Sequence, residues 1–137
     1  MPRIVALDVG DATIGVAAAD ELNITVNPIR TILRSKSIKA DLRTVVVLLE
    51  ELDANKVVVG IPLTAEGEEG FQAQKVKDFS ERLARRLRIP VELWDERFST
   101  VEAEQALIEA DVSRDKRRKV IDQLAAVIIL ESYLANR

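Results

Sequence analysis

The sequence predicts an α/β fold, with one domain over residues 1–137 in which helices cover both faces of a mixed β-sheet. Residues 4–7 and 56–62 are apolar runs too continuous for strands with one face in water, so they suit central strands covered on both sides. Residues 4–19 read as a tight hairpin, with a turn at Gly10 between two apolar arms. Strand and helix patterns then alternate, which favours a sheet with both antiparallel and parallel neighbours.

The segments after the hairpin begin with a strand and a helix. Residues 24–33 alternate loosely between apolar and polar and contain Pro28, which predicts an edge strand. Apolar residues at helical spacing predict an amphipathic helix over residues 39–52. The apolar strand 56–62 follows and ends in a Gly/Pro break.

The middle of the chain repeats this alternation. Residues 63–70 hold two glycines and three glutamates, which predicts a flexible loop. Residues 71–87 predict a helix whose C-terminal end is rich in arginine, as the helix dipole favours. Residues 90–94 predict a third buried strand.

Two helices are expected at the end of the chain. Residues 99–102 match a capping box, which predicts a helix from near Thr100 to about Glu109. Residues 113–119 read as a basic linker, and residues 120–134 as the closing helix. The core stripe expected on this helix is Ile121, Leu124, Ala125 and Ile128.

The composition excludes several kinds of chemistry. The chain has no cysteine and no histidine, which removes disulfides, thiolate catalysis, zinc–thiolate sites and the commonest general base. Hydrolysis must therefore use carboxylates, hydroxyls or lysines. The net charge of −3 argues against a wholly basic surface, but 20 Lys and Arg residues leave room for a basic patch. With no signal-peptide pattern and no apolar run of about 18 residues, we expect a cytoplasmic protein.

Acidic residues stand inside or at the edge of three apolar elements. Asp8 lies near the end of the first strand, Asp95 and Glu96 end the last strand, and Asp122 lies near the start of the last helix. Because ligands gather where the C-terminal ends of parallel strands meet, we expect these carboxylates to converge. Alanines three and four residues after Asp122 would let its helix approach the sheet closely.

Convergent carboxylates without a basic partner repel one another, and the usual remedy is a hard divalent cation, Mg²⁺ or Mn²⁺. Two such ions about 4 Å apart can activate water and stabilise the leaving oxygen of a phosphodiester. Adjacent strand residues point to opposite faces, so we expect Glu96 to face the metal, with Asp95 as the alternate that otherwise bonds the backbone or Arg97. Taken singly, Asp8 could cap a turn and Asp122 could stabilise a helix N-terminus.

A basic cluster directly precedes the helix that carries Asp122. We expect it to flank the carboxylates and bind phosphates, which would let a net-acidic protein hold a polyanion locally. The alternative interpretation is a solvated linker between two helices. The cluster consists of Arg114, Lys116, Arg117, Arg118 and Lys119.

Four motifs, in the right order over the whole chain, resemble those of the YqgF family, also called RuvX, of the RNase H-like superfamily. They are residues 4–10 with 14–17, residues 58–63 with Gly67 and Gly70, residues 94–103 with their Asp-Glu-Arg triplet, and residues 121–126 with 129–130 and 133–134.

The resemblance implies an RNase H-like fold, with a central five-stranded mixed β-sheet, and a metal-dependent nuclease. It implies that Asp8, Glu96 and Asp122 are catalytic and hold Mg²⁺ or Mn²⁺, and that nucleic acid is the partner, which we expect Arg97 to contact as well. The implied roles are 5′-end processing of pre-16S ribosomal RNA or, alternatively, Holliday junction resolution in recombination and repair. Residues 11–13 lack the basic residue usual in the family's first turn, which weakens any role of this turn in gripping phosphate.

Two further interpretations stay open. Asp8, Val9 and Gly10, followed by Gly15, also resemble the first phosphate loop of actin-like and sugar-kinase ATPases, but those proteins place two such domains around the nucleotide. A catalytically idle RNA-binding or ribosome-assembly factor would keep the same fold. A junction resolvase would be expected to act as a symmetric homodimer.

Overall fold

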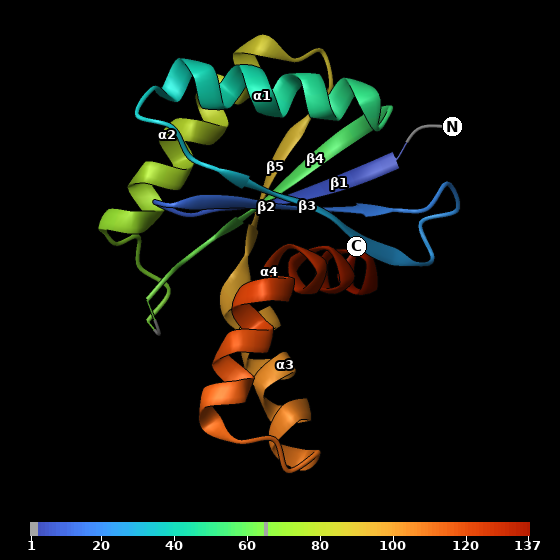
Figure 1. The fold of residues 1–137 in the computed structure, drawn as a ribbon, viewed down its shortest axis with the longest axis vertical. Coiled ribbons are helices and arrows are strands. Elements are labelled where there is room, and N and C mark those ends of the chain that lie inside the picture. Colours follow the sequence, from blue (N-terminus) through green and yellow to red (C-terminus); the bar gives the residue numbers. More distant parts are fainter. Residues whose placement is uncertain (1–2, 65) are drawn as a thin grey trace.

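The centre of the structure, a computed structural model, is a five-stranded mixed sheet with the strand order β3-β2-β1-β4-β5 (Figure 1). Strands β1 (Arg3–Val9), β2 (Thr13–Ala19) and β3 (Val26–Leu33) pair antiparallel, and β3 lies at one edge. Strands β4 (Ala54–Ile61) and β5 (Val91–Asp95) run parallel to β1. The predicted hairpin, the edge strand and the mixed sheet are confirmed.

Helices cover both faces of this sheet. In Figure 1, α1 (Ile38–Glu51) and α2 (Phe71–Arg86) lie on one face, and the C-terminal half of α4 (Arg114–Asn136) lies on the other. Helix α3 (Glu96–Glu109) packs against α4, and the two extend together away from the sheet. Among the helices of the described residues, none has the length and apolar character needed to span a bilayer.

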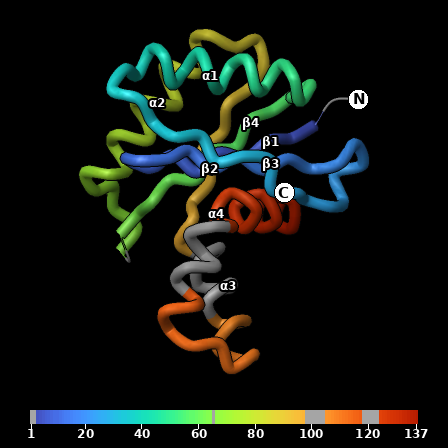
Figure 2. Tube along the Cα trace, in the orientation of Figure 1, coloured from blue at the N-terminus to red at the C-terminus, as the bar shows by residue number. Residues whose placement is uncertain are grey.

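The structure describes the backbone of residues 3–64 and 66–137 and, within these, all side chains except those of residues 98–104 and 118–123; everything outside this description is grey in Figure 2. Alternating side chains of β1 enter two separate cores. Val5 and Leu7 pack in the core under α1 and α2. Ile4 and Ala6 pack in the smaller core under α4. The next residue on the α4 face is Asp8, so β1 delivers a carboxylate to the side of the sheet that α4 covers.

Three expectations about the second half of the chain are wrong. Strand β5 is an edge strand rather than a buried one, because only β4 pairs with it, and Leu93 is 36% exposed. Helix α3 begins at Glu96 rather than near Thr100, because the Asp95 carboxylate accepts a hydrogen bond from the Arg97 backbone N–H and caps the helix where the strand ends. The basic segment is not a linker, because Ser113 caps α4 and the helix starts at the next residue.

The core stripe of α4 also differs from the expected one. Leu124 is 37% exposed, Ala125 and Ile128 are half-buried, and the side chain of Ile121 lies outside the described residues. The first half of α4 extends beyond the sheet, and only the second half packs against the strands. The contact of this second half with the sheet therefore determines which side of α4 is buried. The buried residues there are Ala126, Ile129, Leu130 and Tyr133.

Candidate active site

Asp8 lies on the face of β1 that α4 covers, next to a gap left by a glycine. Its partner across the antiparallel pair is Gly15 of β2. A Cβ atom built on Gly15 would lie 3.8 Å from the Asp8 Cβ and 3.7 Å from the Ala126 Cβ. Ala126 of α4 therefore packs over the hairpin beside the carboxylate, as the alanines of α4 had indicated.

Glu96, the first residue of α3, also turns toward the face that α4 covers. Strand β4 lies between β1 and β5, and its residue Gly60 pairs with Trp94. A Cβ atom on Gly60 would lie 2.7 Å from the Glu96 Oε2 and would collide with the side chain of Ile129. The space above Gly60 is thus shared by the Glu96 carboxylate and a core side chain of α4.

The electrostatics of Glu96 follow from this location. Burial raises the pKa of Glu96 to about 7, and the negative charges of Asp8 and Asp95 add to the rise. Burial and the neighbouring charges therefore favour the protonated form of Glu96. A cation bound between Asp8 and Glu96 would favour the ionised form of both carboxylates.

Asp95, directly before Glu96, has a different environment. Its carboxylate accepts hydrogen bonds from the Arg97 backbone N–H at 3.0 Å and from the guanidinium Nη2 at 2.7 Å. The hydrogen bond from the Arg97 side chain is the main reason that the pKa of Asp95 lies below its ordinary value. The predicted bonds of Asp95 to the backbone and to Arg97 are confirmed.

The third carboxylate of the expected set is Asp122 of α4. The side chain of Asp122 lies outside the described residues. Among the residues that are described, no three or more His, Cys, Asp and Glu side chains gather as metal ligands would. The described part of the site is therefore a pair, Asp8 and Glu96.

A pocket of about 230 Å³ opens beside Asp8, between the β2–β3 edge of the sheet and α4. Thr13 and Thr31 line it on the strand side, and Ala125 and Ala126 form part of its helix side. The pocket gives a ligand of several heavy atoms room next to the Asp8 carboxylate.

Comparison with known proteins shows which family the chain belongs to. A family profile described as "RuvX: Holliday junction resolvase" matches residues 2–136. The chain belongs to the RuvX family. The resemblance of the four sequence motifs is thereby confirmed.

Close relatives of this RuvX chain share its whole length. A protein of Clostridioides difficile (strain 630) is 50% identical over 132 residues, which are 96% of this chain and 93% of that protein. A protein of Caldanaerobacter subterraneus subsp. tengcongensis is 50% identical over 136 residues, 98% of this chain and 97% of that protein. Both carry the name "Putative pre-16S rRNA nuclease".

Two solved structures show the same fold at low sequence identity. One is Thermus thermophilus RuvC in complex with a Holliday junction, with a TM-score of 0.54, 14% identity, and coverage of 75% of this chain and 69% of that one. The other is a ROK family protein of Streptococcus pneumoniae in complex with sucrose, with a TM-score of 0.53, 18% identity, and coverage of 77% and 38%. The likeness to RuvC confirms the predicted RNase H-like fold class.

Among the side chains that the structure describes, the basic residues expected to bind nucleic acid in this RuvX chain differ in exposure and contacts. Arg114 and Lys116 are exposed in the first turns of α4. Arg117 is half-buried, and its Nη1 donates to the Val112 carbonyl oxygen at 2.8 Å. The side chains of Arg118 and Lys119 lie outside the described residues.

Arg97 is held by local contacts. Besides its bonds to Asp95, its Nη1 donates to the Thr64 carbonyl oxygen at 3.3 Å. The same Nη1 would lie 3.3 Å from a Cβ atom on Gly67, whose φ of +83° suits glycine. Arg97 therefore joins the start of α3 to the loop before α2, and this geometry gives it a structural contact that the sequence interpretation lacked.

Sequence reasoning missed two features, Gly60 within the site and the Arg34–Asp41 pair on the opposite side of the sheet. Gly60 was interpreted only as part of a strand-ending break, although a glycine inside an apolar strand signals close approach of another group. The buried pairing of Arg34 with Asp41 was not noticed either. The sequence offers one sign of this pair. Asp41 directly precedes Leu42, the first apolar residue of the helix face that packs in the core.

Proposed function

We propose that this chain is a metal-dependent nuclease that cleaves phosphodiester bonds in the 5′ region of pre-16S ribosomal RNA. The observation that carries the proposal is the pair of carboxylates, Asp8 and Glu96, on the face of the sheet covered by α4, with the pKa of Glu96 raised to about 7. The relatives that share half of its residues carry the corresponding name.

The residues present fit a hard divalent cation. Carboxylate oxygens are the donors that Mg²⁺ and Mn²⁺ prefer, and the chain has no histidine or cysteine to offer instead. The negative charges of Asp8 and Asp95 contribute to the raised pKa of Glu96, and a bound cation would offset this repulsion. Gly60 leaves the space that the Glu96 carboxylate occupies, and a methyl group there would compete with it.

We assign Asp8, Glu96 and Asp122 as metal-holding and catalytic residues. Asp122 precedes Ala126 by four residues in α4, one helical turn, and Ala126 faces Gly15 beside Asp8. Mg²⁺ or Mn²⁺ at these carboxylates would supply an activated water and stabilise charge on the leaving oxygen. Asp95, paired with Arg97, fixes the start of α3 and so holds Glu96 at the end of β5.

Exposed cations in the first turns of α4 are assigned to bind the nucleic acid backbone. Arg114 and Lys116 extend from the same helix that carries Asp122. Each phosphate that such a cation neutralises strengthens binding without selecting a sequence. Arg118 and Lys119 are proposed for the same role, whereas Arg97 and Arg117 are engaged with protein groups.

Cleavage of a pre-16S rRNA leader fragment tests the proposal. We expect the parent protein to cleave it with Mn²⁺ or Mg²⁺ and to be inactive with a chelator. Asp8→Asn, Glu96→Gln and Asp122→Asn should each reduce the rate by at least about 100-fold while the circular dichroism spectrum stays unchanged. Asp11→Asn, an exposed aspartate in the turn after Asp8, is the matched control and should cleave at the parental rate.

Two results would contradict the proposal. A parent that binds the RNA tightly but never cleaves it would favour an idle RNA-binding assembly factor. A triple carboxylate variant that cleaves at the parental rate would remove the assigned site.

A four-way DNA junction is the second candidate substrate, because the matching family profile is described as a Holliday junction resolvase. Faster cleavage of the junction than of the RNA fragment would favour it. A resolvase should also act as a homodimer, since two symmetric cuts need two sites. Sedimentation with and without the junction tests that expectation.

A further inference from the structure

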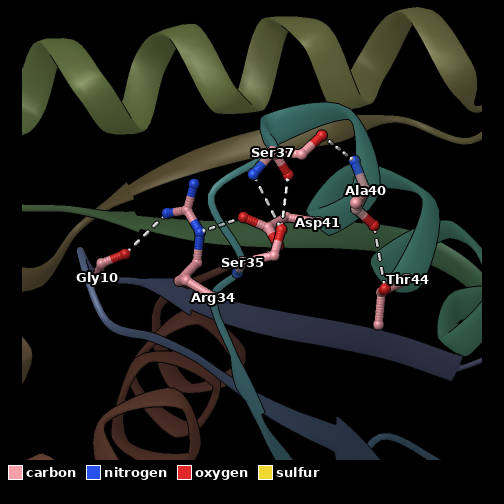
Figure 3. Close-up of polar contacts among 7 residues, drawn as sticks. All are labelled: Gly10, Arg34, Ser35, Ser37, Ala40, Asp41 and Thr44. Carbon is pink, nitrogen blue, oxygen red and sulfur yellow. Dashed lines mark hydrogen bonds and ion pairs between the residues drawn. The ribbon is translucent and has the colours of Figure 1, made fainter.

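Asp41, in the first turn of α1, is a buried carboxylate that the proposed chemistry does not use. It is 3% exposed and lies on the opposite side of the sheet from α4. Its Oδ2 accepts a hydrogen bond from the Arg34 Nε at 2.8 Å, and its Oδ1 accepts bonds from the Ser35 N–H at 2.9 Å and the Ser35 hydroxyl at 2.8 Å (Figure 3). Burial alone would raise the pKa of Asp41, but these bonds outweigh it and hold the pKa below its ordinary value. The carboxylate therefore fixes Arg34 in one orientation.

Arg34 also donates two hydrogen bonds to the turn between β1 and β2. Its Nη1 donates to the Gly10 carbonyl oxygen at 2.8 Å (Figure 3). Its backbone N–H donates to the Ala12 carbonyl oxygen at 2.9 Å. The turn itself is closed by a bond from the Gly10 N–H to the Thr13 carbonyl oxygen at 2.9 Å. Both ends of the turn are thus bonded to one residue.

The guanidinium group is also packed from α2. It lies 5.2 Å from the centroid of the Phe79 ring, in cation–π geometry. By contrast, the other link from α2 to this turn, Lys75 with Asp11 at 3.2 Å, joins two exposed side chains and contributes little. The side chain of Arg34, which is 16% exposed, therefore connects the turn to the helices α1 and α2.

We infer that Arg34, oriented by Asp41, is a positioning residue that fixes the β1–β2 turn and thereby sets the place of Asp8, two residues before Gly10. The inference rests on the proposed function of Asp8 as a metal-holding residue. Arg34 acts through the hairpin backbone, because its contacts lie on the α1 and α2 side of the sheet whereas the Asp8 side chain faces α4.

The geometry requires a guanidinium and not just a positive charge. An arginine can donate to Asp41 and Gly10 at the same time from two nitrogens, whereas a lysine has one nitrogen and can serve only one of these acceptors well. Arg34→Lys should therefore keep the ion pair but loosen the turn. The matched control is Arg43→Lys, which makes the same change on an exposed side chain of α1.

The experiment measures three quantities on the full chain. Hydrogen exchange of the Gly10 amide reports the turn, calorimetric titration with Mn²⁺ reports the carboxylates, and cleavage of the RNA fragment gives kcat and KM. For Arg34→Lys we expect faster exchange at Gly10, Mn²⁺ affinity and kcat both lower by about 10- to 100-fold, and KM within about twofold of the parent. If Arg34→Lys does not fold, Ser35→Ala, which removes one bond to Asp41, should show the same pattern more weakly.

The outcomes separate this inference from the proposed function. If Arg34→Lys matches Arg43→Lys in Gly10 exchange, Mn²⁺ affinity and kcat, the positioning role is wrong even though the parent is a nuclease. A merely stabilising role predicts a lower melting temperature with Mn²⁺ affinity unchanged, which also overturns the inference. If the parent neither binds Mn²⁺ nor cleaves RNA, the proposed function fails. The role of Arg34 in holding the turn is then tested by hydrogen exchange alone. An unchanged exchange rate of the Gly10 amide in Arg34→Lys would contradict that role.

Discussion

At the scale of single residues, the adjacent carboxylates Asp95 and Glu96 show how environment separates two similar side chains. Asp95 is paired with Arg97 and has a pKa below its ordinary value, whereas Glu96 is buried above Gly60 and has a pKa of about 7. The difference comes from the end of β5, where the chain turns into a helix and directs the two side chains to different partners. Only Glu96 is left with an unfavourable charge that a cation would relieve.

The raised pKa of Glu96 predicts a pH-dependent stability. Between its ordinary pKa of 4.5 and about 7, Glu96 is protonated in the folded chain and ionised in the unfolded chain, so the free energy of unfolding falls as the pH rises through this window. Glu96→Gln removes this loss. In a chelating buffer we expect the variant to be more stable than the parent by about 1 to 3 kcal/mol at pH 8, and equally stable at pH 4.

Urea denaturation at several pH values measures this difference. Glu68→Gln, on an exposed loop residue, is the control and should follow the parent at every pH. A stability difference for Glu96→Gln that does not change between pH 4 and pH 8 would contradict the assigned environment. Mn²⁺ should stabilise the parent protein but not Glu96→Gln.

Asp41 predicts the opposite dependence on pH. Its pKa in the folded chain lies below the ordinary value of 3.8, so its contribution is fully present above that value and is lost as the pH falls through the folded-state pKa. Asp41→Asn should lower the free energy of unfolding by about 2 kcal/mol at pH 7, because it removes charge-assisted bonds from Arg34 and Ser35. The difference between variant and parent should shrink between pH 4 and pH 2, and a constant difference over that range would contradict the prediction.

At the scale of elements, α4 packs over two glycines of the sheet that have different surroundings, Gly15 and Gly60. Gly15 lets Ala126 pack over β2, and a methyl group there would make ordinary van der Waals contacts at 3.7 and 3.8 Å. Gly60 has no such room, because Ile129 and Glu96 already occupy the space above β4. Glycine is therefore required at position 60 of β4, whereas position 15 of β2 has room for a methyl group.

This contrast predicts different effects of the same substitution. Gly60→Ala should lower the free energy of unfolding by about 1 to 3 kcal/mol, because α4 or Glu96 must shift to admit the methyl group. Gly15→Ala should change it by less than about 1 kcal/mol. Thermal denaturation of both variants measures the effect, and equal melting temperatures would show that α4 does not pack on β4 as described.

At the scale of the whole molecule, charge is distributed so that a net-acidic chain carries exposed cations on the helical extension. Arg114 and Lys116 lie in the first turns of α4, whereas Arg85 and Arg86 lie in the last turn of α2. Helix α2 covers the opposite face of the sheet from α4 (Figure 1). Both groups are exposed, so composition alone cannot separate them. The two groups differ in location, because α4 covers the face of the sheet that carries Asp8 and Glu96, whereas α2 covers the opposite face.

The position of Arg114 and Lys116 predicts a local effect on binding. The double variant Arg114→Ala/Lys116→Ala should weaken RNA binding for all sequences and flatten the dependence of log K on log salt by about 0.7 to 0.9 per lost phosphate contact. Arg85→Ala/Arg86→Ala, which removes the same charge elsewhere, is the control and should leave the slope unchanged. Equal effects of the two double variants would return the α4 cations to the solvated-surface interpretation.

Much of the fold was predictable because its signals are local. Continuous apolar runs identified β1 and β4, Pro28 marked β3 as an edge, and the Gly10 turn closed the hairpin. The same period-based reasoning placed α1 and α2 within one or two residues of their observed bounds. These features depend on which neighbours in sequence are apolar, and that is what a sequence displays directly.

The errors have one physical origin. The start of α3 at Glu96 depends on a side-chain cap at a strand end, and the core face of α4 depends on where a long helix meets the sheet. The capping-box pattern at residues 99–102 correctly indicated a helix. The helix nevertheless begins before this pattern, because Asp95 caps it at Glu96. The local sequence pattern therefore predicted that these two helices exist. It did not predict the first residue of α3 or the buried face of α4.

The sequence by itself determined that neither histidine nor cysteine can serve in the proposed chemistry of this RuvX chain, and it showed acidic residues interrupting apolar elements. The tertiary structure placed Glu96 on the same face of the sheet as Asp8, as strand alternation had favoured. It alone showed that Gly60 makes room for Glu96 and that Arg34 and Asp41 hold the neighbouring turn. The reason is that electrostatic environment and close approach depend on groups far apart in the chain, which only packing brings together.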